Sequence, residues 1–314
     1  MKQLKPTDYS TMKKLFLSSA LSIAPLVIGP SVLAGPGENA TGNLKNTPND
    51  CNTTSDSCLI TPTKFSAKIY QVALCTSHPM PAGSALDLNG SGCVDVYKSD
   101  TGEETGDIFS DTGATLSAEN ITIPEPGTYG FVAALFDTEF KAASHHMVYA
   151  AGGAPINDKR YVSTSGGGAQ EGDVGEEQML SGEFNTFSPA IDCSNGSHMA
   201  ERTSTTGANG VYTNFLSGGE SFFGRVLKDD FTLATQNLGN INNNNATCGG
   251  AKYLLSIVNK GTIIGENSAG IHIKILAPKG LMRVNQGNAG DGVITGFSAH
   301  GESMAVSVSP VSGN

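Results

Sequence analysis

The clearest strand signal in the chain is TYGFVAALF, which runs from Thr128 to Phe136. It follows the turn Pro124–Gly127, and its mixture of aromatic, β-branched and small apolar residues is typical of a β-strand. The run is almost continuously apolar and does not alternate between apolar and polar residues. Such a pattern predicts a central strand that is covered on both faces.

A second strand, Lys64–Cys75, is predicted earlier in the chain by an alternation of apolar and polar residues. The alternation places Ile69 on the face opposite to Tyr70 and Val72, so the strand is expected to be partly buried. We expect Cys93–Tyr97, which is also rich in strand-forming residues, to be its partner.

Short strand-like runs separated by turns continue to the end of the chain, and Ile271–Leu276 alternates almost ideally. No segment has a sustained 3.6-residue apolar period, and no repeat of fixed length is visible. Glycine is abundant at 39 residues and Trp is absent, while Lys and Glu are too sparse for long surface helices. We therefore predict an all-β protein, an antiparallel β-sandwich of immunoglobulin-like or jelly-roll-like type.

A Gly-rich acidic segment interrupts these runs and is expected to be a long exposed loop or a hinge. The strands on its two sides form either two sandwiches or one merged body, and we favour the merged body. A polar stretch with few large apolar residues lies ahead of them and is interpreted as an extended arm. The predicted order is a signal peptide at 1–34, the arm at 35–60, a first half at 61–164, the Gly-rich loop at 165–177 and a second half at 178–314.

The start of the chain has the residue order of a secretory signal peptide. Lys13 and Lys14 precede the apolar run Leu15–Ile28, and Val32–Ala34 supplies the small residues that a signal peptidase reads. The run is shorter than the about 20 apolar residues that a membrane span needs, although a retained anchor is the alternative. Pro36 stands where a lipid-modified cysteine would have to be. We expect an exported protein without membrane insertion, located outside the cell, on its outer surface or in the periplasm.

Cleavage after Ala34 would leave a strongly acidic chain of 280 residues. The leader holds four of the 19 basic residues and one of the 29 acidic ones, so the mature net charge is −13. Translation from Met12, the alternative start to Met1, gives the same mature chain. Because this charge repels phosphate backbones and no basic patch offsets it, nucleic acid is excluded as an expected partner.

The chain has six cysteines, and all of them follow the leader. An even number in an exported chain predicts three disulfides, although fifteen pairings are formally open. Metal binding is the alternative, but no C-x-x-C motif occurs and no histidine stands at ligand spacing from a cysteine. Order along the chain favours pairs that each bracket a polar, turn-rich segment, namely Cys51–Cys58, Cys75–Cys93 and Cys193–Cys248.

The segment DLNGSG, Asp87–Gly92, matches the first half of a calcium-binding loop. A bidentate glutamate is expected at the twelfth position of such a loop, and Lys98 stands there instead. Calcium is therefore one hypothesis for this loop, and a plain hairpin turn between the two flanking strands is the favoured alternative. The calcium ligands would be Asp87, Asn89, Ser91 and Asp95.

No catalytic constellation stands out in the sequence, which has no G-x-S-x-G, H-E-x-x-H or G-x-x-x-x-G-K motif. Glu176 and Glu177 are adjacent in the Gly-rich segment, where two carboxylates are not expected at the fixed separation that a glycosidase needs. His145 and His146 are adjacent in a predicted strand, so their side chains point to opposite faces and do not easily share a metal. We assign no catalytic residue and favour a protein without enzymatic activity.

Three short motifs give a resemblance to known proteins. They are the Tyr-x-Val-x-Leu-Cys pattern of Tyr70–Cys75, the pair Cys93-Val94 and the turn Pro126–Tyr129. Together they resemble exported hypothetical proteins of marine bacteria, and the Pro-Gly-Thr-Tyr turn alone is similar to bacterial immunoglobulin-like surface domains. The resemblance covers about residues 66–137. It implies a cysteine-stapled β-sandwich outside the cytoplasm, without a known activity.

Taken together, the residues favour a secreted or cell-surface, non-enzymatic β-sandwich protein that acts by interaction or assembly, as an envelope, adhesive or pilus-like component. Its partner would be a protein or glycan at the cell surface or a second copy, and the arm could pair with a neighbour's sheet edge. The alternative is an exported carbohydrate-binding module or glycan-active enzyme with carboxylates on its loops. An aromatic content of 7% argues against a large sugar-binding platform, although Tyr can serve in one.

Overall fold

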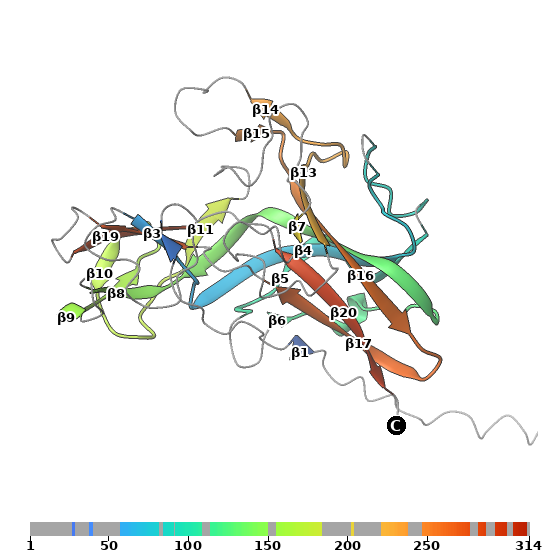
Figure 1. Cartoon of the computed structure of the whole chain (residues 1–314), viewed down its shortest axis with the longest axis horizontal. Coiled ribbons are helices and arrows are strands. Elements are labelled where there is room, and N and C mark those ends of the chain that lie inside the picture. Colours follow the sequence, from blue (N-terminus) through green and yellow to red (C-terminus); the bar gives the residue numbers. More distant parts are fainter. Residues whose placement is uncertain are drawn as a thin grey trace, which may run out of the picture.

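The computed structural model shows a β-protein whose strands cross one another in several sheets (Figure 1). It contains one short 3₁₀-helix, η3 (Ala118–Asn120), among the residues it describes. No helix in this part of the chain is long and apolar enough to cross a membrane. The described residues are 27–28, 38–39, 57–81, 84–90, 92–108, 114–149, 155–183, 202–203, 221–237, 247–276, 282–286, 293–299 and 304–312.

Seven strands form the central sheet, and all of its pairings are antiparallel. It contains strands from both sides of the segment 165–177. One of these seven strands, β11 (Leu180–Glu183), pairs with the end of the longest strand, β7. This end lies beyond the residues of β7 that pair with β16. The other six lie in the order β12 (Arg202–Thr203), β13 (Ser221–Leu227), β16 (Tyr253–Ile264), β7 (Gly127–Ala143), β4 (Lys64–Cys75) and β5 (Cys93–Glu104).

Smaller antiparallel sheets pack around the central sheet or extend from its ends (Figure 1). The pair β17 (Ser268–Leu276) and β20 (Ala305–Ser312) covers one of its faces. A four-stranded sheet has the order β19 (Ile294–Ala299), β18 (Met282–Gln286), β3 (Ser57–Ile60) and β2 (Glu38–Asn39). The remaining sheets consist of β8 (His145–Tyr149), β9 (Pro155–Ser163) and β10 (Ala169–Glu171), of β1 (Val27–Ile28) and β6 (Ala114–Thr115), and of β14 (Thr235–Asn237) and β15 (Thr247–Gly249).

The strand β7 is central, as its nearly continuous apolar run predicts. It pairs with β4 along one edge and with β16 along the other. Val132, Ala134 and Phe136 lie in the main apolar core, whereas Ala133 and Leu135 lie in a second cluster on the opposite face. Both faces of β7 are therefore buried, which explains why the run shows no alternation with polar residues.

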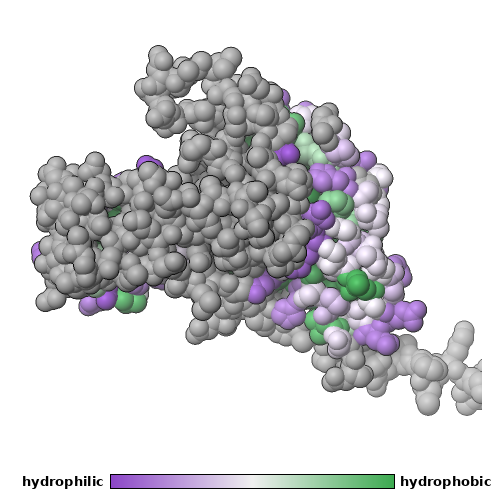
Figure 2. Space-filling model, viewed as in Figure 1, coloured by the Kyte–Doolittle hydropathy of each residue, from purple (hydrophilic) through white to green (hydrophobic). Residues whose placement is uncertain are grey.

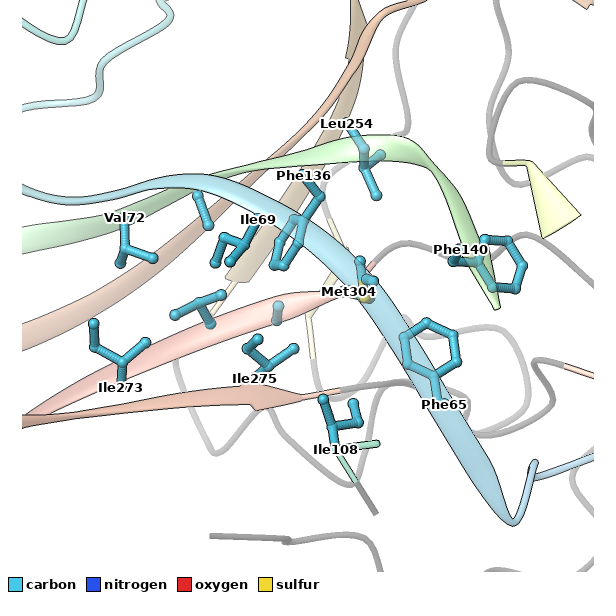
Figure 3. Packing of buried hydrophobic residues seen from close by; sticks show 14 of the residues in the cluster. Phe65, Ile69, Val72, Ile108, Phe136, Phe140, Leu254, Ile273, Ile275 and Met304 are labelled. Carbon is cyan, nitrogen blue, oxygen red and sulfur yellow. The ribbon is translucent and has the colours of Figure 1, made fainter. Parts of the chain in front are cut away.

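The main core lies between the central sheet and the pair β17–β20 (Figure 3). Ile69 and Val72 of β4 point toward Ile273 and Ile275 of β17, and Met304 lies at the start of β20. Each fully buried apolar side chain of this size contributes roughly 1.5–3 kcal/mol relative to an exposed one. Two antiparallel layers over one apolar core confirm the predicted all-β sandwich.

The expected orientation of Ile69 is wrong, because β4 is irregular at this point. Ile69 and Val72 are both fully buried in the main core, whereas Tyr70 packs against the second cluster. The pairing of β4 with both neighbours shifts in register between Ile69 and Gln71. A bulge inserts an extra residue into a strand, so simple alternation fails across it.

The disulfide between Cys75 and Cys93 is confirmed, with an S–S distance of 2.02 Å. The two cysteines lie directly opposite each other at the ends of β4 and β5, so the bond ties the two strands together where the connecting segment leaves the sheet. Cys51 and Cys193 lie outside the described residues. The pairs Cys51–Cys58 and Cys193–Cys248 therefore stay predictions.

The composition of the Gly-rich segment 165–177 predicts a long exposed loop or a hinge, but part of the segment forms a strand. Its residues 169–171 form β10, which pairs with β9 across a turn at Gly167. Gly168 also forms a bridge with Gly296 of β19, and the last residue of the segment, Glu177, is buried. The segment therefore follows the neighbouring strands closely, because glycine lets the backbone of one element approach another.

Candidate functional site

The face of the central sheet opposite to β17 and β20, called the outer face here, has an apolar cluster of its own. It is smaller than the main core and combines small and branched side chains of four strands. Met80 and Leu88 from the β4–β5 connection and Leu233 from the turn after β13 cover part of it. The buried members on the strands are Ala73, Cys75, Ala133, Leu135, Leu227, Leu255 and Ile257.

A row of aromatic side chains crosses the outer face beside this cluster, and we call Tyr70, Asp137, Tyr253 and Phe231 the aromatic row. Tyr253 of β16 is paired with Asp137 of β7, whose Oδ2 accepts a hydrogen bond of 2.9 Å from the Tyr70 hydroxyl of β4. The rings of Tyr70 and Tyr253 meet edge to face at 5.2 Å, and Phe231 stacks on Tyr253 at 5.3 Å. The row therefore runs across the strands instead of along one of them.

The bulge in β4 and a glycine in β5 together place Tyr70 in this row. The register shift between Ile69 and Gln71 turns Tyr70 to the outer face, while Ile69 stays in the core. Gly102 of β5 has a φ of +70°, and a Cβ atom there would lie 2.8 Å from the Tyr70 ring and 2.7 Å from Lys68 Cε. Glycine at this position is therefore needed both for the backbone conformation and for the close approach of the ring.

Phe231 occupies a backbone conformation that costs energy for its residue type. Its φ is 60°, and no other non-glycine among the described residues has a positive φ. It closes a turn in which Phe231 N donates to Lys228 O at 3.1 Å and Lys228 N donates to Thr232 O at 2.7 Å. Left-handed backbone costs a residue with a Cβ atom roughly 1–2 kcal/mol, and glycine is the usual residue there. Strained backbone of this kind is common at functional sites, so the half-exposed phenyl ring of Phe231 is a candidate binding group.

Charged groups surround the rings of the aromatic row. Burial and the hydrogen bond to Asp137 raise the pKa of Tyr70, so its hydroxyl stays protonated and donates to Asp137 throughout the physiological range. Lys68 Nζ lies 5.4 Å from the centroid of the Tyr70 ring, and Lys252 Nζ lies 6.0 Å from that of Tyr253. The row thus presents ring surface and a fixed carboxylate, and an ammonium group lies beside each of its two tyrosine rings.

A second polar cluster, called the Glu177 cluster here, lies at the other end of β4. Glu177 Oε2 forms an ion pair of 3.3 Å with Lys64 Nζ and accepts a hydrogen bond of 2.9 Å from the Gly175 N–H. The other carboxylate oxygen, Oε1, contacts His145 Nδ1. The Glu177 side chain is 2% exposed, whereas those of Lys64 and His145 are 34% and 26% exposed. Burial alone would raise the pKa of Glu177, but hydrogen bonds from the backbone, His145 and Lys64 outweigh it and lower the pKa.

The Glu177 cluster holds the Gly-rich segment against the sheet and leaves no free carboxylate for acid–base chemistry. Glu176 Oε2 accepts a hydrogen bond from the Asp173 backbone N–H within the same turn, so the two adjacent glutamates serve separate contacts. Burial, with a smaller contribution from the charge of His145, lowers the pKa of His146 to about 4. His146 is therefore neutral at neutral pH and acts as part of the packing.

Two of the proposed calcium ligands, Asp87 and Asp95, have carboxylates that are engaged in contacts within the protein. Asp87 Oδ1 accepts hydrogen bonds from the backbone N–H groups of Asn89 and Gly90, at 3.0 and 2.6 Å, as in an Asx turn. Asp95 contacts Gln71 and forms an ion pair of 3.5 Å with Lys98. Within the described part of the chain, no group of three or more His, Cys, Asp and Glu residues is placed to hold a metal ion. Ser91 lies outside it, so calcium binding stays a prediction.

Comparisons with known proteins do not extend this description. No family model, no curated protein and no solved structure matches the chain. The function is therefore argued from the residues and contacts of the chain itself.

The sequence pattern predicted the strand that carries Tyr70 but not the aromatic row. A pattern of apolar residues marks neither the β-bulge beside Tyr70 nor the positive φ of Phe231 in the turn after β13. The sequence held one sign of the unusual backbone at Phe231. In the turn Lys228–Thr232, Phe231 directly follows two aspartates, at a position where glycine or asparagine is common. Asp137, the first charged residue after the apolar run of β7, marks the point at which the outer face becomes polar.

Proposed function

We propose that the protein is an exported, non-enzymatic binding protein and that the aromatic row binds a glycan chain. The observation that carries this proposal is the transverse arrangement of Tyr70, Tyr253 and Phe231 with Asp137 between two of the rings. Aromatic rings offer a flat apolar surface to the C–H groups of a sugar ring, while carboxylates and ammonium groups bond to its hydroxyls. Both kinds of group are present within one row.

The length of the row also suits a chain-like ligand. The ring centroids lie 5.2 Å apart for Tyr70 and Tyr253 and 5.3 Å apart for Tyr253 and Phe231, so the three rings span at most about 10 Å across the strands. Such a span fits a short oligosaccharide within a longer polymer better than a single small molecule. An extended ligand that lies across the strands would contact each ring of the row in turn.

Apolar residues are dispersed over the described surface seen in one view, and Phe231 is exposed, which favours a small, specific site over a broad apolar contact. Figure 2 shows that hydrophobic residues in the described part of this view lie as separate patches among hydrophilic ones. Phe231 is one of the few large apolar residues of the described chain with an exposed fraction above one third, at 39%. A surface of this kind matches recognition by a few rings and hydrogen bonds, as glycan binding requires.

Binding to an array of neutral and uronate-containing oligosaccharides tests the proposal, with the best binder then measured by calorimetry. We expect Tyr253→Ala and Phe231→Gly each to weaken binding at least about tenfold, which corresponds to about 1.4 kcal/mol. Ile263→Ser is the matched control, because Ile263 is an exposed apolar residue of the same strand β16 but lies at its far end. Circular dichroism would show that each variant keeps its strands.

Two results would contradict the proposal. The first is an absence of binding to every oligosaccharide and polysaccharide of the array. The second is a binder whose affinity is lowered equally by the Ile263 variant and by the variants of the row, because binding would then not depend on the aromatic row.

A further inference from the structure

The strand β3 connects two distant parts of the sequence. It pairs with β2, the strand before it in the chain, on one side and with β18, near the end of the chain, on the other. The register joins Ile60 with Met282 and Ser57 with Asn285, and β19 occupies the other edge of β18. A strand from the start of the chain therefore fills an edge that the C-terminal part of the chain leaves open.

The segment that connects β3 with β4 is short, and only its last residue is hydrogen-bonded to the sheet, because Thr63 N and Thr63 Oγ1 both donate to Ala143 O, at 2.8 and 3.2 Å. It consists of Thr61, Pro62 and Thr63, after which the chain enters the central sheet. Proline has no N–H to donate, and Thr61 Oγ1 is buried without a hydrogen-bond partner among the described residues. The hydroxyl of Thr61 would regain a hydrogen bond to water if the segment straightened and became exposed. Short connections of this kind favour exchange of the strand that they carry.

The edge of β18 needs a strand, because its side chains are part of the core. Met282 and Val284 are fully buried, and Ile60 at the end of β3 is 4% exposed. Without a strand in the place of β3, the backbone N–H and C=O groups of β18 on that side would lack their ladder, and this part of the core would be exposed. Any copy of Ser57–Ile60 in the same register would meet these requirements equally well.

We propose that β3 of one molecule pairs with β18 of a second molecule, so that the protein assembles by strand exchange. The occupant is the same sequence in the same register, so the pairing of β3 with β18 is kept, and the chain changes its course at Thr61 and Pro62, before the hydrogen bonds of Thr63 to Ala143. Reciprocal exchange gives a closed dimer, and exchange in one direction gives a chain of molecules. The pairing joins an early strand with a late one, so β18 is made after the arm and can accept the arm of a neighbour.

A photocrosslinking residue at position 59, which pairs with Arg283, tests the exchange in the full chain. Unlabelled and ¹⁵N-labelled protein are mixed, incubated as folded protein or refolded together, separated by size and irradiated. Mass spectrometry then identifies peptides cross-linked to residues 282–286. We expect cross-links between a labelled and an unlabelled peptide in the dimeric or larger fractions, and cross-links of one label in the monomer.

A second placement at position 57, opposite Asn285, covers the case in which the residue at 59 prevents folding. Thr61→Val is the matched hinge variant, since it removes the buried hydroxyl while keeping the shape of the side chain. It should reduce the exchanged fraction by about tenfold, because the closed connection no longer buries an unsatisfied group. Mixed-label cross-links that are absent in both mixing procedures and at both positions, with monomer as the only species, overturn the proposal. This test does not depend on glycan binding.

Discussion

The strand β4 takes part in two polar clusters that use their carboxylates differently. At its start, Lys64 joins His145 on the buried Glu177, whose side chain is 2% exposed. Near its middle, the uncharged hydroxyl of Tyr70 donates a hydrogen bond to Asp137, which is partly exposed beside aromatic rings. One carboxylate is thus enclosed by a lysine and a histidine, and the other lies at a surface, where it accepts a hydrogen bond from the phenol hydroxyl of Tyr70.

This difference separates a stabilising contact from a binding surface. A buried carboxylate that contacts a lysine, a histidine and a backbone N–H has its hydrogen-bonding capacity used, and its removal leaves the lysine charge without this partner. A carboxylate at the surface, held in place by a phenol, keeps lone pairs for hydroxyl groups of a ligand. We therefore expect variants of the Glu177 cluster to change the free energy of unfolding, and variants of the aromatic row to change affinity more than stability.

The largest effect is expected for Glu177→Gln. The variant removes the charge that Lys64 and His145 share, and breaking a buried ion pair from one side costs about 3 kcal/mol or more. Urea unfolding at pH 7 measures the change in the free energy of unfolding. Glycan affinity should stay within about twofold of the parent, because the cluster lies at the other end of β4 from the row, and a larger change would break the separation between the two regions.

The same variant has a defined pH dependence. The pKa of Glu177 is lowered in the folded protein, so its contribution is present above the unfolded value of about 4.3 and is lost as the pH falls through the lower folded value. The stability difference between the parent and Glu177→Gln should therefore shrink only below about pH 4. A difference that is already gone at pH 5.5 would contradict this assignment.

His146 should add a separate acid sensitivity at higher pH. Its pKa is lowered to about 4 by burial, and in the unfolded chain it is about 6.5. Between these values the unfolded state binds more protons, so the free energy of unfolding falls as the pH falls, by at most about 3 kcal/mol. His146→Gln removes this titration and should flatten the stability profile between pH 6.5 and 4. Urea midpoints over this range, compared with those of the parent, measure the effect.

The sequence was informative about strands because strands leave a repeating pattern. The continuous apolar run of β7 correctly indicated burial on both faces, and the spacing of Cys75 and Cys93 correctly indicated a disulfide across two strands. The aromatic row was missed because it depends on single irregular positions. A bulge beside Tyr70 and a positive φ at Phe231 change the direction of a side chain without changing the pattern of apolar residues.

The Glu177 cluster was missed for a different reason. Its members come from the start of β4, from β8 and from the end of the Gly-rich segment, and only the folded chain brings them together. The composition of residues 165–177 predicted a long exposed loop or a hinge. The burial of one glutamate among several cannot be read from local sequence, because it depends on where distant cations lie.

Gly102→Ala should disturb the aromatic row by an intermediate amount. The new Cβ would meet Tyr70 and Lys68 at less than 3 Å, so the ring must move and its bond to Asp137 is weakened. Gly106→Ala is the matched control, since Gly106 has a φ of +67° and no atom within 4 Å of the added Cβ. We expect about 1 kcal/mol of destabilisation for the control and about 1 kcal/mol more for Gly102→Ala. Equal losses in thermal unfolding would show that Tyr70 adapts without cost.

The smallest change in stability and the sharpest test of the comparison come from Phe231. Both Phe231→Gly and Phe231→Ala remove the ring from Tyr253, but only glycine relieves the backbone at a φ of 60°. The glycine variant should therefore be more stable than the alanine variant by about 1 kcal/mol and lie within about 1 kcal/mol of the parent. Glycan affinity should fall to the same extent in both, because both lack the ring. A glycine variant that binds glycan as well as the parent would contradict the comparison. The ring of Phe231 would then stabilise the fold alone, as the Glu177 cluster does.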